Sequence, residues 1–368
     1  MTEHDTAPAR RPLADSDSPY DVLVFIGRFQ PFHFGHRKVI EEALRRAQHV
    51  VVLVGSAFAA PSHRNPFSFK ERQRMIAESF TADQADRLII RPLEDRLYNN
   101  TAWVEQVQET VDGVVETLHE FATSPRIGLI GVNKDNTSYY LKLFPQWGSV
   151  EVKAETLLGA TELREGLFSE EAGAWLARAG ALVPANVLAQ LAAFCRQEAH
   201  DQICEEYRFI RGYRQSWAAA PYPPVFVTTD AVVIQAGHVL LIERGARPGK
   251  GLLALPGGYL GSDQTIEDSM LRELREETRI RVPDPVLRGS IIGAPKVFDE
   301  PNRDPRGRFI THAFLLSLTP RREEGFKLPR IKGSDDAAAA HWRPLAECRR
   351  ADMFLDHYDI IQNMVATL

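Results

Sequence analysis

The stretch Gly27-Arg28-Phe29-Gln30-Pro31-Phe32-His33-Phe34-Gly35-His36 decides the fold of the first half of this chain. It directly follows Asp21–Ile26, an apolar and β-branched run typical of a buried parallel strand. Residues 35–48 then show the apolar spacing of a helix. A strand that ends in such a turn and opens a helix favours an anion, because unpaired backbone N–H groups and the helix dipole both attract phosphate. The stretch therefore predicts a phosphate site.

Two histidines within this stretch suggest chemistry at that site. His33 and His36 are three residues apart, so both can face one side of the first helical turn. Imidazole groups there can donate to phosphate oxygens as charge develops in a transition state. Gly35 allows the backbone to approach a ligand closely. The His-x-Gly-His pattern alone is more typical of two surface histidines beside a tight turn, but the preceding strand and the full stretch favour the phosphate site.

The rest of the first half alternates strand and helix patterns, which predicts a parallel α/β sheet with helices on both faces. Strand-like runs recur at 49–54, 87–90 and 127–130, and helical patterns at 69–80, 101–121 and 184–200.

These features resemble the nucleotidylyltransferase superfamily, and within it the nicotinamide-nucleotide adenylyltransferases that carry G-R-F-Q-P-F-H-x-G-H. Tyr98–Trp103 is similar to that family's nicotinamide-nucleotide binding stretch. Residues 131–147 resemble its G-x-x-K-D-x-S-S-Y-Y-L…F-P-x-W segment, and Gly159–Arg164 resembles its I-S-x-T-x-x-R motif. In the last motif Ala160 stands where the family usually has serine. The resemblance covers about residues 20–200.

The resemblance implies a Rossmann-like domain that transfers AMP from ATP to nicotinamide mononucleotide and releases pyrophosphate, with Mg²⁺ bridging the ATP phosphates. It implies catalytic roles for His33, His36 and Arg164, and substrate contacts from Gly27, Arg28, Phe29, Gly35, Asn99, Trp103, Lys134, Asp135 and Thr161. Trp103 is as typical of a core aromatic as of a ring that stacks on pyridine. Lys134 and Asp135 are as typical of solvated loop charges. Nicotinate mononucleotide and phosphopantetheine stay open as alternative acceptors.

The pattern of strands that alternate with helices ends at Ala218–Pro224, which is the best candidate for a linker. Hairpin-like strands at 226–235 and 239–244 follow it, which indicates an α+β unit of ordinary domain size. Further strands are expected at 289–292, 309–318 and 337–342, and helices at 265–278 and 355–367. We predict a disordered leader at 1–19, a first domain at 20–205, a linker at 206–224 and a second domain at 225–368. Domains with their own cores usually fold separately.

A cluster of glutamates marks the second half. Glu273, Glu276 and Glu277 share one face of the predicted helix, where uncompensated like charges are destabilising. A divalent cation would reverse that effect, and it prefers oxygen ligands. The alternative is a solvated acidic face, but the turn Pro256-Gly257-Gly258 shortly before the helix favours the metal site.

This region resembles the Nudix box, G-x5-E-x7-R-E-U-x-E-E-x-G-U, over Gly258–Ile280. Two positions depart from it: Gln264 replaces the first glutamate, where it can still hydrogen-bond Arg272, and Arg279 replaces the last glycine. The resemblance implies an α/β/α sandwich that binds Mg²⁺ or Mn²⁺ and activates water to attack a pyrophosphate. It implies metal ligands Gly257, Glu273, Glu276 and Glu277, of which Glu276 and Glu277 are catalytic.

Segments beside the box resemble Nudix domains that act on ADP-ribose, which would give AMP and ribose 5-phosphate. They imply substrate contacts from Arg244, Phe298, Arg303 and Arg306. The whole chain thus resembles bifunctional nicotinamide-nucleotide adenylyltransferase and Nudix ADP-ribose pyrophosphatase proteins of NAD metabolism. Hydrolysis of another nucleoside diphosphate derivative stays open, as does a regulator that senses ADP-ribose without cleaving it.

Composition narrows these alternatives. The 368 residues carry a net charge of −5, which gives no support for a nucleic-acid-binding surface or for the DNA-reading element that a regulator would need. No apolar run reaches the length of a membrane span, and the N-terminus lacks a secretory signal. The three cysteines include no C-x-x-C pair, so a reducing cytoplasm is the expected compartment. The oligomeric state, a homo-oligomer included, stays open.

Overall fold

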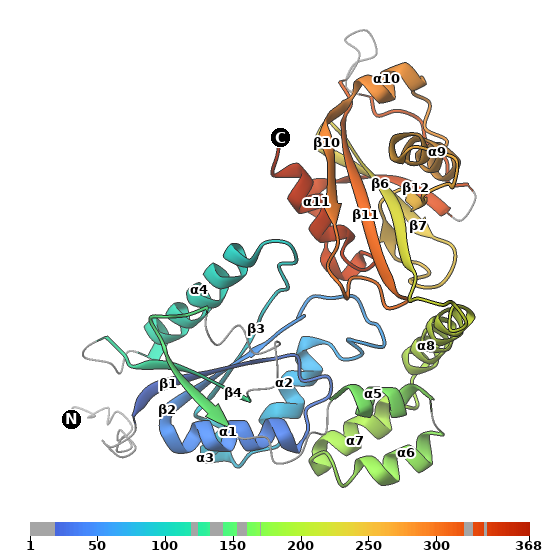
Figure 1. Ribbon diagram of the computed structural model, residues 1–368. Helices are drawn as coiled ribbons and strands as arrows, with labels where there is room; N and C mark the ends of the chain where they lie inside the picture. The colour runs from blue at the N-terminus through green and yellow to red at the C-terminus, as the bar shows by residue number, and fades with distance from the viewer. Residues whose placement is uncertain are drawn as a thin grey trace, which may run out of the picture.

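The computed structural model describes residues 19–118, 124–132, 143–152, 160–169, 171–319, 327–334 and 337–368. Within these residues the chain forms two domains, each built on its own sheet and joined by the helix α8 (Glu198–Ser216) (Figure 1). No helix of the described residues is long and apolar enough to cross a membrane.

The first domain is a five-stranded parallel sheet with the order β3-β2-β1-β4-β5. Its strands are β1 (Tyr20–Gly27), β2 (Ala47–Val54), β3 (Leu88–Pro92), β4 (Ile127–Val132) and β5 (Gly148–Val152). The order reverses beside β1, and ligands of open α/β sheets bind at the carboxyl ends of the strands at such a reversal. The predicted phosphate stretch begins at this point. The short β5 was not predicted.

Helices cover both faces of this sheet, as predicted. They are α1 (Phe34–Arg46), α2 (Phe69–Ala77), α3 (Ala82–Ala85) and α4 (Asn100–Leu118). On β1, Leu23 and Phe25 pack with α1 and α2, while Val22 and Val24 pack on the other face with α4. This alternation along β1 follows from the two-residue period of a strand.

Four helices complete the first domain: α5 (Ala160–Ser169), α6 (Ala172–Ala179), α7 (Ala185–Phe194) and α8. The single helix predicted at 184–200 is wrong, because the chain ends α7 at Phe194 and starts α8 at Glu198. The first part of the predicted linker is helical. Residues 206–216 belong to α8, which packs Ile203 and Tyr207 on the first core. At its far end Tyr213 and Trp217 contact Phe226 of the second domain.

The second domain is a mixed sheet with the order β10-β11-β6-β7-β12, to which β8 and β9 add at β7 and β6. Among the described strands of this sheet, β6 and β11 pair in parallel and the other pairs are antiparallel. The strands are β6 (Val225–Gln235), β7 (His238–Arg244), β8 (Leu253–Ala254), β9 (Gly257–Tyr259), β10 (Ile291–Phe298), β11 (Arg308–Ser317) and β12 (Ala337–Pro344). The turn between β6 and β7 is the predicted hairpin, with positive φ at Ala236 and Gly237.

Two helices enclose this second sheet. On one face α9 (Ile266–Thr278) packs Met270 and Leu274 on the sheet, and on the other face α11 (His357–Val365) packs Ile360 and Ile361. The strand predicted from residue 289 begins at 291, because α10 (Asp284–Gly289) occupies the preceding residues. Two short helical turns, η3 (Leu345–Glu347) and η4 (Arg350–Asp352), lead to α11.

Candidate active sites

The first candidate site begins at the N-terminus of α1. His33 caps the helix, its Nδ1 accepting a hydrogen bond from the Gly35 N–H at 3.1 Å. The rings of His33 and His36 stack with their centroids 3.7 Å apart. A Cβ at position 35 would lie 2.9 Å from the His33 ring, so glycine is needed there for this ring to cap the helix. The two predicted catalytic histidines therefore lie together at the sheet reversal.

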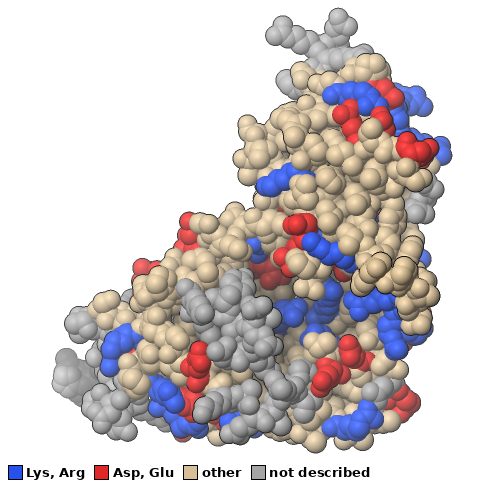
Figure 2. Space-filling model, in the orientation of Figure 1, with Lys and Arg blue, Asp and Glu red and all other residues tan. Residues whose placement is uncertain are grey.

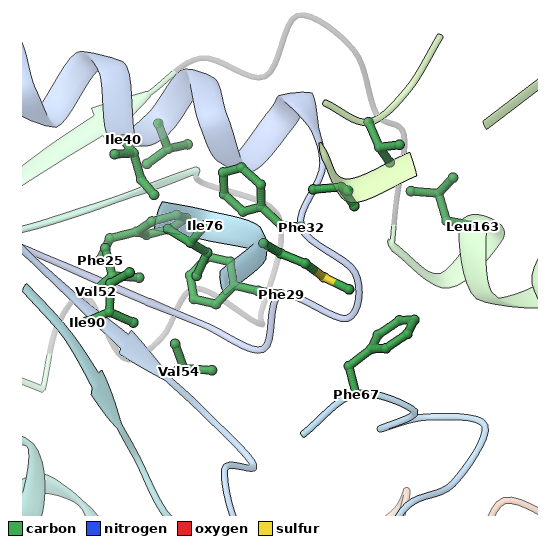
Figure 3. Close-up of a cluster of buried hydrophobic side chains, with 14 of the residues drawn as sticks. Phe25, Phe29, Phe32, Ile40, Val52, Val54, Phe67, Ile76, Ile90 and Leu163 are labelled. Atoms are coloured by element: carbon green, nitrogen blue, oxygen red, sulfur yellow. The ribbon is translucent and has the colours of Figure 1, made fainter. Parts of the chain in front are cut away.

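The turn before these histidines is held by aromatic packing (Figure 3). Phe29 adopts a left-handed φ of 53° and is only 1% exposed, with its ring against Phe25, Phe32 and His36. A Cβ at Gly27 would lie 2.8 Å from the Phe29 ring. The predicted substrate contact of Phe29 would therefore have to come from its backbone. This side chain is part of the core and shapes the turn from beneath.

Arg164 is buried beside the same turn. Its Nη1 donates to the Gln30 carbonyl at 2.6 Å and its Nη2 to the Thr161 hydroxyl at 3.2 Å. Burial, with the nearby Arg28 and Arg64, lowers the pKa of Arg164 to about 10. The predicted residues Arg28, Thr161 and Arg164 are thus brought into one neighbourhood.

The sequence analysis missed two further members of this cationic cluster, Arg64 and Arg214. Burial and the Arg64, Arg214 and Arg164 charges lower the pKa of His63 to about 4. Burial, followed by Arg214 and Arg28, also lowers the pKa of Arg64. The arginines of this cluster lower the pKa values of one another and of His63, as like charges held close together do. Such a gathering of positive charge is typical of a site for a polyanion. Figure 2 shows Lys and Arg side chains gathered in the hollow between the two domains.

Arg72 was also missed, and it fixes the backbone of this site. It is 1% exposed, and its guanidinium donates to the carbonyls of Arg28 and Gly55 at 2.7 Å each and of Ser56 at 3.2 Å. These carbonyls belong to the turns that follow β1 and β2. The sequence signal was the capping box from Ser68 that starts α2 and orients its arginine.

The remaining predicted contacts of the first site differ in their placement. Asn99 is exposed, and its Oδ1 accepts from the Ala102 N–H at 3.0 Å, which caps α4. Trp103 is half-buried against the core beside Phe144, so the core alternative describes most of its surface. Lys134 and Asp135 lie outside the described residues.

The second candidate site is a cavity of about 520 Å³ between β9, α9 and the 303–309 segment. Glu277 is 6% exposed, and its Oε2 accepts from the Gly257 N–H at 2.9 Å. Burial raises the pKa of Glu277 to about 8. A Cβ at Gly258 would lie 2.5 Å from Glu273 Oε1, so the glycine turn lies directly against the carboxylates.

Arg272 ties the predicted ligands together. It donates to Glu273 at 2.8 Å and to Glu276 at 2.7 Å, and its Nε donates to Gln264 at 2.9 Å. The expected Gln264–Arg272 hydrogen bond is therefore present. Within the residues that the structure describes, no group of three or more His, Cys, Asp or Glu side chains is already assembled to hold a metal. The donors nevertheless fit a divalent cation, since they are carboxylate oxygens and a cation would offset the burial that disfavours a Glu277 charge.

Basic and aromatic side chains form the rest of this cavity. Arg244 lies over the Phe354 ring at 4.1 Å, and Arg306 lies over the Phe309 ring at 4.7 Å while it pairs with Asp304. Both predicted arginines therefore line the cavity. The aromatic rings were not predicted.

The other two predicted contacts are placed differently. Phe298 is fully buried in the core under α11, so its predicted role in substrate binding is wrong. Arg303 lines the cavity, but its guanidinium makes two hydrogen bonds to Asp356, at 2.8 and 2.9 Å. It is therefore already engaged in a buried ion pair.

Comparisons with known proteins find one family for each of the two domains. A family model described as Cytidylyltransferase-like matches residues 24–120, and one described as NUDIX domain matches residues 225–364. A nicotinamide/nicotinic acid mononucleotide adenylyltransferase of Acinetobacter baylyi is 38% identical over 190 residues, which cover 51% of this chain and 94% of that protein. An ADP-ribose pyrophosphatase of Methanocaldococcus jannaschii is 32% identical over 137 residues, which cover 37% of this chain and 71% of that protein.

One solved structure matches nearly the whole molecule. It is a bifunctional NMN adenylyltransferase/ADP ribose pyrophosphatase from Francisella tularensis complexed with AMP and an Mn ion. It is 33% identical, with a TM-score of 0.82 over 95% of this chain and 99% of that chain. The fold and both sites define a nucleotidyltransferase domain joined to a Nudix domain. The chain belongs to the family of bifunctional NMN adenylyltransferase/ADP-ribose pyrophosphatases.

Proposed function

We propose that this enzyme transfers AMP from ATP to nicotinamide mononucleotide, giving NAD and pyrophosphate, and hydrolyses ADP-ribose to AMP and ribose 5-phosphate. The observation that supports the first activity is the stacked His33–His36 pair beside the Arg28, Arg64 and Arg164 cations. The second activity is supported by the glycine turn at Gly257, which lies against the buried Glu277.

In the first site, positioning and electrostatics carry the reaction. The acceptor's phosphate oxygen attacks the α-phosphorus of ATP in line, and the bond from that phosphorus to the pyrophosphate oxygen breaks. Arg28, Arg64 and Arg164 hold the triphosphate and neutralise the leaving pyrophosphate. The imidazole N–H groups of His33 and His36 donate to phosphate oxygens as their charge grows. No covalent intermediate is needed.

In the second site, Glu273, Glu276, Glu277 and the Gly257 carbonyl would hold Mg²⁺ or Mn²⁺. When bound, the metal would activate water and polarise the pyrophosphate. Arg272 pairs with one oxygen of Glu273 and one oxygen of Glu276, which holds the two carboxylates close together. Arg244 and Arg306 bind the phosphates from the opposite wall, and Phe309 and Phe354 offer apolar surface to the nucleoside.

A second acceptor, nicotinate mononucleotide, is favoured by one observation. The Acinetobacter baylyi relative, which covers most of the first domain, is named for both nicotinamide and nicotinic acid mononucleotides. The two acceptors differ by an amide against a carboxylate on the pyridine ring. We therefore expect both to react, with nicotinamide mononucleotide preferred.

The test is product analysis with the full chain. The protein is incubated with ATP, Mg²⁺ and either mononucleotide, and separately with ADP-ribose and Mg²⁺, and the products are separated by ion-exchange chromatography. We expect NAD with pyrophosphate, and AMP with ribose 5-phosphate. A clear preference for nicotinate mononucleotide overturns the acceptor assignment. Binding of ADP-ribose with metal but without cleavage replaces the hydrolase by a sensor.

A further inference from the structure

Residues 94–98 leave the first domain after β3 and reach the second domain before α4 begins; we refer to them as the bridging segment. Arg350 of the second domain donates to Glu94 Oε1 at 3.2 Å and to the Asp95 carbonyl at 2.8 Å. Asn363, on α11, donates to the Leu97 carbonyl at 3.5 Å. The segment is thus held from outside its own domain at several successive residues.

Tyr98 is the last and most firmly held residue of the bridging segment. Its hydroxyl donates to Asp356 Oδ2 at 2.6 Å, and its ring meets Phe298 edge-on with the centroids 4.9 Å apart. Its φ of 65° is left-handed, which is uncommon for a bulky residue and persists where surrounding contacts enforce it. The enforcing contacts come from the core of the second domain.

The partner of Tyr98 is itself immobile. Asp356 is 1% exposed and accepts two further hydrogen bonds from the Arg303 guanidinium. Burial opposes its ionisation, but Arg303 and the Tyr98 hydroxyl outweigh burial and hold the pKa of Asp356 below its usual value. A buried carboxylate needs all of its donors, and so Tyr98 is directed to a single position.

The bridging segment leads directly into Tyr98–Trp103, the stretch that resembles a nicotinamide-nucleotide binding segment. Asn99 follows Tyr98 and caps α4, and Trp103 lies in the first turn of that helix. Asp95 also accepts from the Ser56 N–H at 3.2 Å, which ties the segment to the turn after β2. The position of Tyr98–Trp103, which resembles a nicotinamide-nucleotide binding stretch, is therefore set by the second domain.

We propose that the second domain completes the acceptor site of the first, with Tyr98 a positioning residue anchored on Asp356 and Glu94 a second anchor on Arg350. This inference rests on the proposed adenylyl transfer. It also limits the expectation that the two halves act independently, because a first domain cut from the second would lose the anchors of its acceptor segment. ATP binding uses the Arg28 and Arg164 neighbourhood, which the hydrogen bonds of Tyr98 and Glu94 to the second domain do not include.

The test uses Tyr98→Phe and Glu94→Gln in the full chain. Tyr98→Phe removes the hydrogen bond to Asp356, and Glu94→Gln turns the charge-assisted bond from Arg350 into a neutral one; both keep side-chain size. Glu205→Gln is the matched control, because Glu205 pairs with Arg247 across the same pair of domains but away from the bridging segment. Because each change weakens one contact that positions the bridging segment, the KM for nicotinamide mononucleotide should rise about threefold to tenfold in both test variants. The KM for ATP, kcat and the control should stay within about twofold.

Other outcomes overturn the proposal. An unchanged acceptor KM in both test variants means that the anchors do not position the site. A fall in kcat, a rise in the ATP KM and a lower melting temperature occurring together mean that the contacts only stabilise the fold. A rise in acceptor KM in Glu205→Gln of the same size means that any loosening of the interface is sufficient. Failure of the proposed function is distinct, since the parent protein would then form no dinucleotide.

Discussion

Arg272 Nε donates to Gln264 Oε1 at 2.9 Å, across the turn that leads into the acidic helix of the Nudix domain. The same guanidinium also pairs with Glu273 and Glu276, and therefore links the turn to the predicted metal ligands. The family pattern has glutamate at position 264, where a carboxylate would give Arg272 a charge-assisted bond instead of a neutral one. Charge-assisted bonds are roughly twice as strong.

Gln264→Glu should therefore keep or modestly raise ADP-ribose hydrolysis and stability. The gain should be on the order of 1 kcal/mol at most, because the pair is partly exposed and screened by solvent. Steady-state hydrolysis and thermal melting of both proteins measure it. Loss of activity in Gln264→Glu would show that the amide itself has a direct role.

Arg279→Gly should stabilise the second domain. Arg279 ends α9 in the left-handed region with φ 44°, a conformation that costs a non-glycine residue about 1 kcal/mol. Arg279→Ala is the control, because it removes the same side chain but keeps the backbone strain. The free energy of unfolding by urea should be higher for glycine than for alanine. A lower value for glycine would contradict the strain at this position.

Arg164→Lys should weaken ATP binding while keeping the charge. Lysine cannot reach the Gln30 carbonyl and the Thr161 hydroxyl with one rigid fork, as the Arg164 guanidinium does. Losing such a bond to a charged group is expected to raise the KM for ATP about tenfold. Arg37→Lys on the exposed face of α1 is the control. Equal ATP KM values for the parent and Arg164→Lys would remove Arg164 from the triphosphate site.

The sequence predicted best where local pattern and function coincide. The β1 strand and the His33–His36 turn follow from residues next to one another, the acidic helix follows from helical spacing, and its Gln264 partner follows from the resemblance to the Nudix box. The start of α9 was placed within one residue, because its cap Thr265 is a strong local signal.

The misses have a common physical cause, which is that sequence spacing does not show which way a side chain faces. Phe29 and Phe298 lie in loop and strand-end positions typical of ligand contacts, yet both are buried in cores. An arginine on a helix usually lies on the protein surface, but the Arg72 side chain is buried. Residues 206–216 were placed in the linker, although they belong to α8, one face of which packs on the first core.

Contacts between the two domains could not be predicted from local sequence patterns. Tyr98 and Asp356 are 258 positions apart, and no periodicity links them. Only the folded arrangement reveals that Tyr98 is anchored on the Nudix domain.

The central claim, that one chain carries two separate chemistries, is tested most directly by measuring both activities on the parent, His36→Ala and Glu277→Gln. His36→Ala should lower NAD formation by about a hundredfold or more, the scale for losing one donor to a developing charge, and spare ADP-ribose hydrolysis. Glu277→Gln should abolish hydrolysis and spare NAD formation, because it removes a metal-binding charge without changing side-chain size. Near-parental NAD formation in His36→Ala, or hydrolysis at the parental rate in Glu277→Gln, would contradict the account.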